Sequence, residues 1–394
     1  MNTELKEKIE KSPMFQLSLG SKELFHTNFL YWLSKAEPNA FWSIMGSFGI
    51  KTDDKGSLAV KREWEHFDLS IVHETVKKKK GKDVKIVDNI VAVIENKVKS
   101  IPRIKQLEEY NDKIETVNKD NECKKILLAL IDPGFDHNEE GWSCVTYEEY
   151  RGSIKECLKI IENDYDRCII EDYYNMIDTL ISFKDEWLRE DFSSMKYMDI
   201  FEDSSVKDDE FFSVDDYIDL RINDLRHKTI FSKMFSSLEV NLKDDKEVNL
   251  KDDKPETGIE KAEDIFKYNI PLTIGYGMTN ATGLIEAKVK INADYLLGIQ
   301  VQGYQYRHFI EFSNSSCVKE FIRKELQDKF GQNHKEEFDI SNKKICSYKN
   351  SEGKKAFQYV YRRIREDETV DDVVKNIVDD VKYLMNKYRV QNCN

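Results

Sequence analysis

Long apolar runs are missing from this sequence of 394 residues. No stretch approaches the roughly 18 to 20 apolar residues that a helix needs to cross a membrane. The first residues, Met1 to Lys6, also lack the apolar core of a signal peptide. We therefore expect a cytoplasmic protein that does not enter a membrane, and the chain is long enough to bury a sizeable core in two domains.

Cysteine and several common site motifs are also scarce or absent. The seven cysteines are scattered, odd in number and never spaced as Cys-x-x-Cys. This spacing indicates neither a disulfide framework nor a zinc site. The sequence contains no Gly-x-x-x-x-Gly-Lys-Ser/Thr, no Gly-x-Gly-x-x-Gly and no His-Glu-x-x-His. Those absences exclude a P-loop ATPase motor, a dinucleotide enzyme and a zincin.

Net positive charge is lacking as well, since the formal net charge is -13. This argues against a protein coated by nucleic acid, because phosphate contacts come from lysine and arginine. Between Thr75 and Lys105, however, ten basic residues stand against three acidic ones. Such a local excess suits an enzyme that selects a polyanionic substrate and releases it. We expect Lys77 to Lys85 to form a turn, and the simpler alternative is that Lys77 to Lys80 are only a solvated hairpin tip.

An acidic residue and a lysine two positions apart follow a strongly apolar run. The run from Ile90 to Ile94 predicts a buried strand, and Glu95-Asn96-Lys97 comes directly after it. Side chains alternate along a strand, so Glu95 and Lys97 should project from the same face. Asp68 lies upstream in a second strand-like segment. If the two strands are neighbours, two carboxylates and an ammonium group converge on one point.

This combination suits metal-assisted cleavage of phosphodiester bonds. Carboxylates can hold Mg²⁺ or Mn²⁺, which activates a water molecule and neutralises charge on the phosphate. A lysine beside them can position the nucleophile or stabilise the developing oxyanion. The acid-x-lysine triplet alone is a weak signal in a chain that is 34% charged. Glu286-Ala287-Lys288 repeats the triplet in a segment where we expect no site.

Two predicted helices frame the strand pair and strengthen the interpretation. The segment from Ser21 to Leu33 predicts an amphipathic helix with Ser21 as its N-cap and Glu23 in its first turn. After Ile101-Pro102 a second helix should begin, because proline favours the first helical position. This second helix carries Gln106 and Tyr110. The order is therefore helix with an acid, strand with Asp, strand with Glu-x-Lys, and helix with Gln and Tyr.

That order resembles the PD-(D/E)XK nuclease superfamily, whose members share the restriction-endonuclease-like fold. More narrowly, it is similar to a bacterial branch with an ELFH-N-L-WL helix at the front and an IENK...QL-Y signature, and the resemblance covers roughly residues 12–190. It implies an α/β fold with a mixed sheet flanked by helices, and Mg²⁺ or Mn²⁺ as the cofactor. Phe67 stands where the superfamily's name has proline, which leaves the chemistry unaffected.

The resemblance also implies a role for individual residues. Asp68 and Glu95 would be metal ligands, and Lys97 would be the catalytic lysine. Glu23 would be the accessory acid of the first helix. Gln106 would lie near the scissile phosphate.

Each of these residues has a simpler interpretation too. Asp68 could cap a turn or pair with a lysine, and Glu95 with Lys97 could form an ion pair at an exposed strand end. Glu23 would be stabilised by the helix dipole without any catalytic part. Tyr110 shares a helix face with Gln106 and could belong to the core. Weaker candidates for site residues are Glu63, Glu65, His66 and His73.

The chain divides into three expected regions. Residues 1–190 form the nuclease-like domain. Residues 191–267 form a helical linker region, in which the charged segment from Glu239 to Lys246 is repeated identically at 247–254. Residues 268–394 form a C-terminal α+β domain for recognition or regulation, with a four-stranded meander and a closing helix. Aromatic residues on those strands could stack on bases or bind a partner, although such alternation is more typical of a sheet's own core.

These patterns favour a metal-dependent nuclease that hydrolyses phosphodiester bonds, with DNA as the expected substrate and, from the resemblance, defence against foreign DNA as the setting. Two alternatives stay open: a non-cleaving module that binds nucleic acid or protein on the same fold, and a nuclease subunit that is active only in a complex. A homo-oligomer or a protein partner through the C-terminal domain also stays open. The intact set of Asp68, Glu95 and Lys97 favours cleavage. The residues expected to contact nucleic acid are Lys77, Lys78, Lys79, Lys80, Lys82, Lys99, Arg103 and Lys105.

Overall fold

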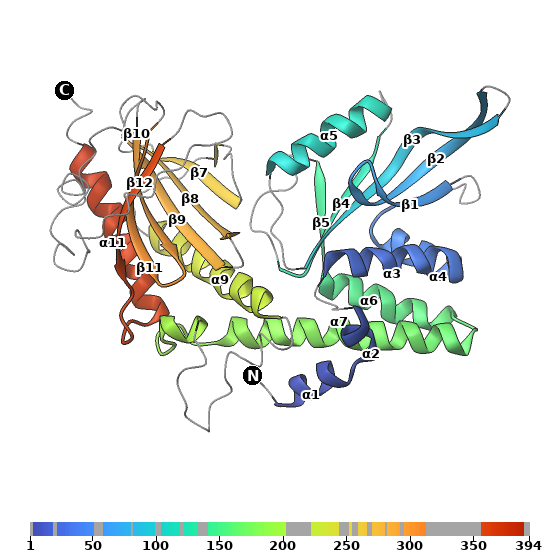
Figure 1. Cartoon of the computed structure of the whole chain (residues 1–394), viewed down its shortest axis with the longest axis horizontal. Coiled ribbons are helices and arrows are strands. Elements are labelled where there is room, and N and C mark those ends of the chain that lie inside the picture. The colour runs from blue at the N-terminus through green and yellow to red at the C-terminus, as the bar shows by residue number, and fades with distance from the viewer. Residues whose placement is uncertain are drawn as a thin grey trace. The chain divides into compact units, whose positions relative to one another are not determined.

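The computed structural model describes residues 3–18, 22–50, 58–79, 82–98, 104–118, 122–131, 141–201, 222–243, 252–253, 259–265, 270–279, 282–291, 295–312 and 356–389. The chain forms two compact units. The first comprises Met1–Trp187 with Asp216–Arg226, and the second comprises Leu188–Asp215 with His227–Asn394. Each contains a sheet with helices packed against it (Figure 1). Within the described ranges, no helix is both long and apolar enough to span a bilayer.

The first unit is built on a mixed five-stranded sheet in the order β1-β2-β3-β4-β5. The first three strands form an antiparallel meander, and the last three run parallel to one another. The strands are β1 (Leu58–Trp64), β2 (Phe67–Lys79), β3 (Lys82–Lys97), β4 (Lys124–Ala129) and β5 (Trp142–Thr146). The buried strand predicted before Glu95 is the second half of β3.

Helices cover both faces of this sheet, which places β3 and β4 in the middle of a layered core (Figure 1). One face carries α5 (Ile104–Asn118), where the amide group of Asn118 bonds both N and O of Ile90. The other helices of the unit are α1 (Thr3–Lys11), α2 (Pro13–Ser18), α3 (Glu23–Ala36), α4 (Pro38–Ser47), α6 (Tyr147–Cys157), the 3₁₀ helix η2 (Leu158–Ile160) and α7 (Asp164–Arg189). This mixed α/β sheet flanked by helices confirms the fold class that the sequence indicates.

Local sequence explains where several helices begin. Thr146 caps α6 in a reciprocal arrangement: its hydroxyl accepts the N–H of Glu149, whose carboxylate accepts the N–H of Thr146. Pro38 stands at the first position of α4. The predicted N-cap of α3 is wrong, because the capping position is Lys22, which makes no side-chain cap, and Ser21 lies outside the described residues.

A tight turn joins β1 to β2. Trp64 pairs with Phe67, so the loop consists of Glu65 and His66, and these have φ values of 54° and 71°. Two successive left-handed residues are the conformation of a type I′ hairpin, which matches the twist of the strands. Glycine and asparagine are the usual residues there. The turn therefore depends on contacts from elsewhere in the unit.

The lysine-rich segment from Lys77 to Lys85 differs from the expected turn. Strand β2 continues to Lys79 and β3 begins at Lys82, so most of the segment from Lys77 to Lys85 is paired ribbon. Val76 and Val84 lie in these extensions, and β-branched residues favour extended backbone even among lysines. The expectation of a long turn is therefore wrong.

The second unit contains a seven-stranded antiparallel sheet in the order β12-β11-β10-β9-β8-β7-β6. The predicted four-stranded meander corresponds to β8, β9, β10 and β11. The elements are η3 (Tyr197–Ile200), α9 (Asn223–Lys243), β6 (Asp252–Asp253), β7 (Ile259–Ile265), β8 (Ile270–Thr279), β9 (Thr282–Lys290), β10 (Tyr295–Gln302), β11 (Gln305–Phe312), β12 (Ala356–Arg363) and α11 (Val370–Arg389). Residues 313–355, between β11 and β12, lie outside the described residues.

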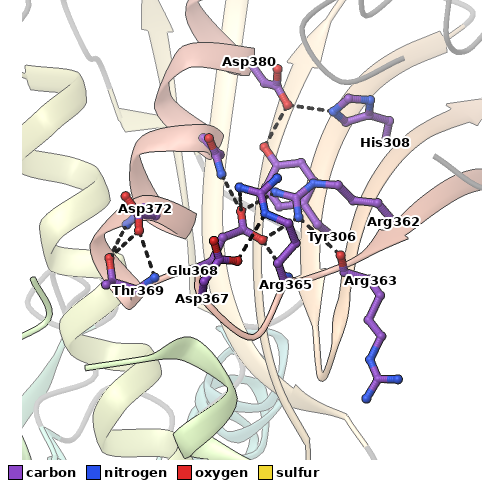
Figure 2. Close-up of polar contacts among 11 residues, drawn as sticks. Tyr306, His308, Arg362, Arg363, Arg365, Asp367, Glu368, Thr369, Asp372 and Asp380 are labelled. Carbon is purple, nitrogen blue, oxygen red and sulfur yellow. Dashed lines mark hydrogen bonds and ion pairs between the residues drawn. The ribbon is translucent and has the colours of Figure 1, made fainter. Parts of the chain in front are cut away.

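Helix α11 joins its sheet through buried charged groups as well as apolar ones (Figure 2). Arg362 of β12 donates two 2.7 Å hydrogen bonds to the carboxylate of Glu368, just before the helix. Within the helix, Asp380 accepts a hydrogen bond from the hydroxyl of Tyr306 and contacts Nε2 of His308 at 2.7 Å. These contacts fix α11 on the sheet, with Val373, Val374, Ile377, Val381 and Leu384 buried beneath it.

Candidate functional site

Asp68 and Glu95 lie side by side at one end of the β2–β3 pair. The last aligned pair of these antiparallel strands is Leu69 with Ile94, and the two acids are one position beyond it. The backbone N–H of Asn96 donates a 2.7 Å hydrogen bond to Oδ2 of Asp68. The strand pairing that the sequence suggested therefore brings both carboxylates together.

Glu95 and Lys97 form a buried ion pair. Nζ of Lys97 is 2.8 Å from Oε1 of Glu95, and the side chains are only 8% and 2% exposed. The simpler interpretation, an ion pair at an exposed strand end, does not apply here because both groups are withdrawn from water. An ion pair so far from water loses more hydration than an exposed one, so both charges depend on the polar groups around them.

Glu23 reaches the same strand end from α3. Its Oε1 accepts a 3.2 Å hydrogen bond from the backbone N–H of Val98, the residue after β3. Glu23 also raises the pKa of Glu95 through its charge, though less than burial or Asp68 does. The front helix therefore places a third acid within electrostatic reach of Glu95.

Gln106 connects the cluster to α5. Its Nε2 donates to Oε1 of Glu95 and to the hydroxyl of Tyr110, both at 2.9 Å. The Tyr110 hydroxyl in turn donates to the carbonyl of His66 in the β1–β2 turn at 2.9 Å. Burial raises the pKa of Tyr110 to about 12, so this hydroxyl stays protonated. Tyr110 thus packs in the core, against Phe67, and also anchors the left-handed turn.

The charged groups shift one another's pKa values. Burial raises the pKa of Glu95 to about 7, with Lys97 opposing the shift and Asp68 adding to it. Burial also raises the pKa of Asp68, although the Asn96 N–H and the charge of Lys97 each act to lower it. For Lys97, burial lowers the pKa, but Glu95 and Glu23 outweigh it and hold the pKa above its usual value. Two mutually repelling carboxylates beside one cation leave an excess of negative charge.

Comparison with protein families accounts for this arrangement. A model of the PD-(D/E)XK nuclease superfamily matches residues 14–175. This segment belongs to the PD-(D/E)XK nuclease superfamily. Comparisons with curated proteins and with solved structures give no match. The matched PD-(D/E)XK segment contains the whole five-stranded sheet and each acid of the cluster.

The donor set of the PD-(D/E)XK segment fits a hard divalent cation. Oε2 of Glu95 is buried and has no hydrogen-bond partner within the described part of the chain. Among the described residues, no three His, Cys, Asp or Glu side chains stand close enough together to hold a metal by themselves. Mg²⁺ needs no such group, because it keeps several waters and binds through one or two carboxylates. Asp68 and Glu95 supply that number.

Sequence reasoning missed a second role for Asn96. Its side chain projects to the face opposite Glu95, where Oδ1 accepts a 2.8 Å hydrogen bond from the hydroxyl of Tyr147. Tyr147 and Asn96 are both buried. The period of two would have placed Asn96 on the opposite face, but no sequence signal points to Tyr147, which comes from the first turn of α6.

The other candidates of the PD-(D/E)XK segment lie in varied surroundings. Glu63 and Glu65 are exposed on the β1–β2 hairpin, and His66 contributes its carbonyl. Lys77 and Lys78 are exposed on β2. The other six expected basic residues divide evenly. Lys79 and Lys82 are on strands and Lys105 is in the first turn of α5, whereas Lys80, Lys99 and Arg103 lie outside the described residues.

Proposed function

We propose that this chain is a metal-dependent nuclease that hydrolyses phosphodiester bonds of DNA. The observation that carries the proposal is the buried Glu95–Lys97 pair beside Asp68, with one oxygen of Glu95 lacking a hydrogen-bond partner within the described part of the chain. Defence against foreign DNA is the setting that we propose from membership of the superfamily.

Asp68 and Glu95 would hold Mg²⁺ or Mn²⁺, which when bound supplies Lewis acidity and neutralises charge on the phosphate. Asp68 is oriented for this by the Asn96 N–H, and Glu95 by Gln106. Lys97 would place its ammonium group next to the reacting phosphate, where it can orient the attacking water or stabilise negative charge on oxygen. Glu23 would fix the end of β3 through Val98.

Cleavage assays on plasmid, linear and single-stranded DNA and on RNA, with Mg²⁺, Mn²⁺ or EDTA, test the proposal. We expect Asp68→Asn, Glu95→Gln and Lys97→Met each to lower the rate by about 100-fold or more, since the first two each remove a proposed metal ligand and the third removes the ammonium group beside the phosphate. EDTA should abolish cleavage by the wild type. Turnover in EDTA, or full activity of the three variants, would overturn the assignment.

The chain offers a matched control for these variants. In β9, Glu286 and Lys288 repeat the Glu-x-Lys triplet, with Nζ of Lys288 2.7 Å from Oε1 of Glu286. Gln300 donates to Oε2 of Glu286 at 3.0 Å, much as Gln106 donates to Glu95. No sequence pattern indicated a site there. Glu286→Gln should therefore cleave at the wild-type rate if the loss at Glu95 is specific.

We propose further that residues 268–394 recognise the target or control the enzyme. Five strands of the antiparallel sheet, β8 to β12, and α11 support a role separate from bond breaking. Residues 191–267 then connect this part to the nuclease-like domain of residues 1–190. A chain lacking residues 268–394 that still cleaves, but with altered target choice or altered control, would support this division. Loss of metal-dependent hydrolysis itself would argue against it, provided the shortened chain is folded.

A further inference from the structure

Strands β2 and β3 continue beyond the rest of their sheet as a two-stranded ribbon. Pairing of β2 with β1 ends at His73, and pairing of β3 with β4 begins at Ala92. Six further β2–β3 pairs follow, from Glu74–Val87 to Lys79–Lys82, and no third strand of the described chain borders them. Figure 1 shows this ribbon reaching past the helices of its unit. We call residues 74–79 and 82–87 the ribbon.

The base of the ribbon is irregular. Register shifts between Ile71 and Val72 and between His73 and Glu74 each leave one extra residue in β3, Val91 and Asp88. Extra residues of this kind bend a strand pair and increase its twist. They commonly redirect a segment or stop it from pairing further. The ribbon is therefore set apart from the sheet at a defined place.

Positive charge dominates the ribbon. Its residues, 74–79 and 82–87, contain five lysines and two acids, a net charge of +3. Part of the acidic charge here is already engaged: Glu74 contacts Lys61 at 2.6 Å and Lys85 at 3.3 Å, and Asp88, at the base of the ribbon, contacts Lys77 at 3.7 Å. Val76 is 61% exposed, and Lys78 beside it is also exposed. The surface suits a polyanionic partner that can also cover apolar groups.

We propose that the ribbon enters the major groove of double-stranded DNA, which makes duplex DNA the substrate class. This inference rests on the proposed nuclease function and deepens it. A major groove about 12 Å wide and 8.5 Å deep admits a two-stranded ribbon, whereas a minor groove about 6 Å wide does not. The major groove of A-form RNA is deep and narrow, so side chains cannot read it. Single strands offer no groove at all.

The position of the ribbon along β2 fits this substrate. Glu74 to Lys79 are 6 to 11 positions from Asp68 on one continuous strand. At about 3.3 Å per residue, they lie roughly 20 to 35 Å from the carboxylate cluster. With one base pair per roughly 3.4 Å, the groove contact falls about 6 to 10 base pairs from the cleaved bond.

Binding measured in EDTA isolates this inference from catalysis. We would titrate a fluorescent 30-base-pair DNA duplex, its single strand and an RNA duplex with the wild type. A charge variant carries Lys77→Gln, Lys78→Gln and Lys85→Gln. Its matched control carries Lys6→Gln, Lys8→Gln and Lys11→Gln, which removes the same number of positive charges from α1, where each of these lysines contacts an acid.

A second variant tests insertion rather than charge alone. It replaces residues 77–84 with Asn-Gly, which joins the paired residues Val76 and Lys85 through a two-residue hairpin. All pairing with β1 and β4 is kept, so the sheet should fold. Methylation of guanine N7, which lies in the major groove, is the matching probe on the DNA.

We expect the wild type to bind duplex DNA at least 10-fold more tightly than the single strand or the RNA duplex. The affinity of the charge variant for duplex DNA should be lower by about 10-fold or more. The slope of log affinity against log salt concentration should become less steep by about 2 to 3. The α1 control should match the wild type. N7 methylation should weaken binding of the wild type but not of the shortened ribbon.

Several results would overturn the inference. They are equal affinity for single and double strands, unchanged binding by both ribbon variants, or no interference from N7 methylation. A wild-type dimer that becomes a monomer when the ribbon is shortened would instead assign the free strand edges to a second copy of the chain. Failure of the proposed function looks different: duplex binding through the ribbon would persist, but no substrate would be cleaved with Mg²⁺ or Mn²⁺.

Discussion

The backbone N–H of Asn96 holds Oδ2 of Asp68 at 2.7 Å, while the side chain of the same residue accepts a hydrogen bond from Tyr147 on the other face of the sheet. The residue between Glu95 and Lys97 therefore connects the acidic cluster to α6. An interaction on one face of the sheet can in this way set the geometry of a carboxylate on the other.

Tyr147→Phe tests this connection. The change leaves the buried Oδ1 of Asn96 without its partner, which should cost about 1 to 3 kcal/mol of stability. We also expect kcat for cleavage to fall several-fold with little change in KM, because Asp68 loses orientation while the substrate contacts remain. Steady-state kinetics and urea unfolding measure the two effects.

Tyr150→Phe is the matched control for that variant. Tyr150 is equally buried on α6, but its hydroxyl makes only a 3.4 Å contact with that of Tyr173. We expect a smaller loss of stability and an unchanged kcat. Equal kinetic effects of the two substitutions would show that Tyr147 acts through general packing.

Gln106→Ala should lower the cleavage rate by about 10-fold or more. The substitution removes the donor that orients Glu95 and separates Tyr110 from the cluster, and misplaced groups are costly to catalysis. The control is Glu109→Gln on the exposed face of α5. If Gln106→Ala cleaves at the wild-type rate at saturating Mg²⁺, then Gln106 has no part in the site.

Gly298→Ala should destabilise the second unit by about 1 to 3 kcal/mol, because the new Cβ overpacks the sheet. It would lie 2.2 Å from Cζ of Phe309 and 2.8 Å from the carbonyl oxygen of Ala287. Gly277→Ala is the control, since its Cβ meets nothing within 4 Å. Hydrogen exchange of the α11 amides in urea measures the stability of the second unit separately from the first. Equal protection in Gly298→Ala and Gly277→Ala would contradict the close packing of Gly298 against Phe309.

Glu368→Gln should destabilise the second unit by about 3 to 5 kcal/mol at pH 7, because Arg362 is left buried without its carboxylate. Burial raises the pKa of Glu368, but Arg362 and the Arg365 N–H outweigh burial and hold the pKa below 4.5. A carboxyl group whose pKa is lower in the folded state than in the unfolded state stabilises the fold. This contribution is fully present above the unfolded pKa and is lost as the pH falls through the folded pKa.

The difference between wild type and Glu368→Gln should therefore shrink in acid and be largest at neutral pH. Hydrogen exchange of α11 at several pH values measures it. Asp367→Asn serves as the control, because its 3.4 Å contact with Arg365 is on the surface, with Asp367 83% exposed. A penalty that is independent of pH would show that the Arg362 contact is not charge-dependent.

The sequence predicted those parts of the site that depend on local periodicity. Glu95 and Lys97 share a face because strands alternate, and Asp68 lies beside them because a hairpin joins neighbouring strands. The contact between Asn96 and Tyr147 could not be predicted in this way. Those residues are 51 positions apart and meet only because the first turn of α6 lies against the end of β3.

The length of the ribbon was also beyond sequence reasoning. Consecutive lysines are typical of a solvated turn, whereas the valines and isoleucines on either side of them favour strands. Which tendency prevails depends on cross-strand pairing such as Val76 with Lys85, a contact that no single segment specifies. The N-cap of α3 is Lys22 and not the predicted Ser21, and a tertiary contact, from the N–H of Val98 to Glu23, holds the first turn of this helix.

The β1–β2–β3 meander has a consequence for synthesis on the ribosome. Asp68, Glu95 and Lys97 all lie within residues 58–97 and are joined by two hairpins, so contacts of short sequence separation assemble them early. Gln106 and Tyr110 emerge next, and Tyr147 emerges last. The nascent chain therefore gathers both carboxylates with Lys97 and the Asn96 N–H before Gln106 and Tyr147 have been made, so the contacts of Gln106 with Glu95 and of Tyr147 with Asn96 form last.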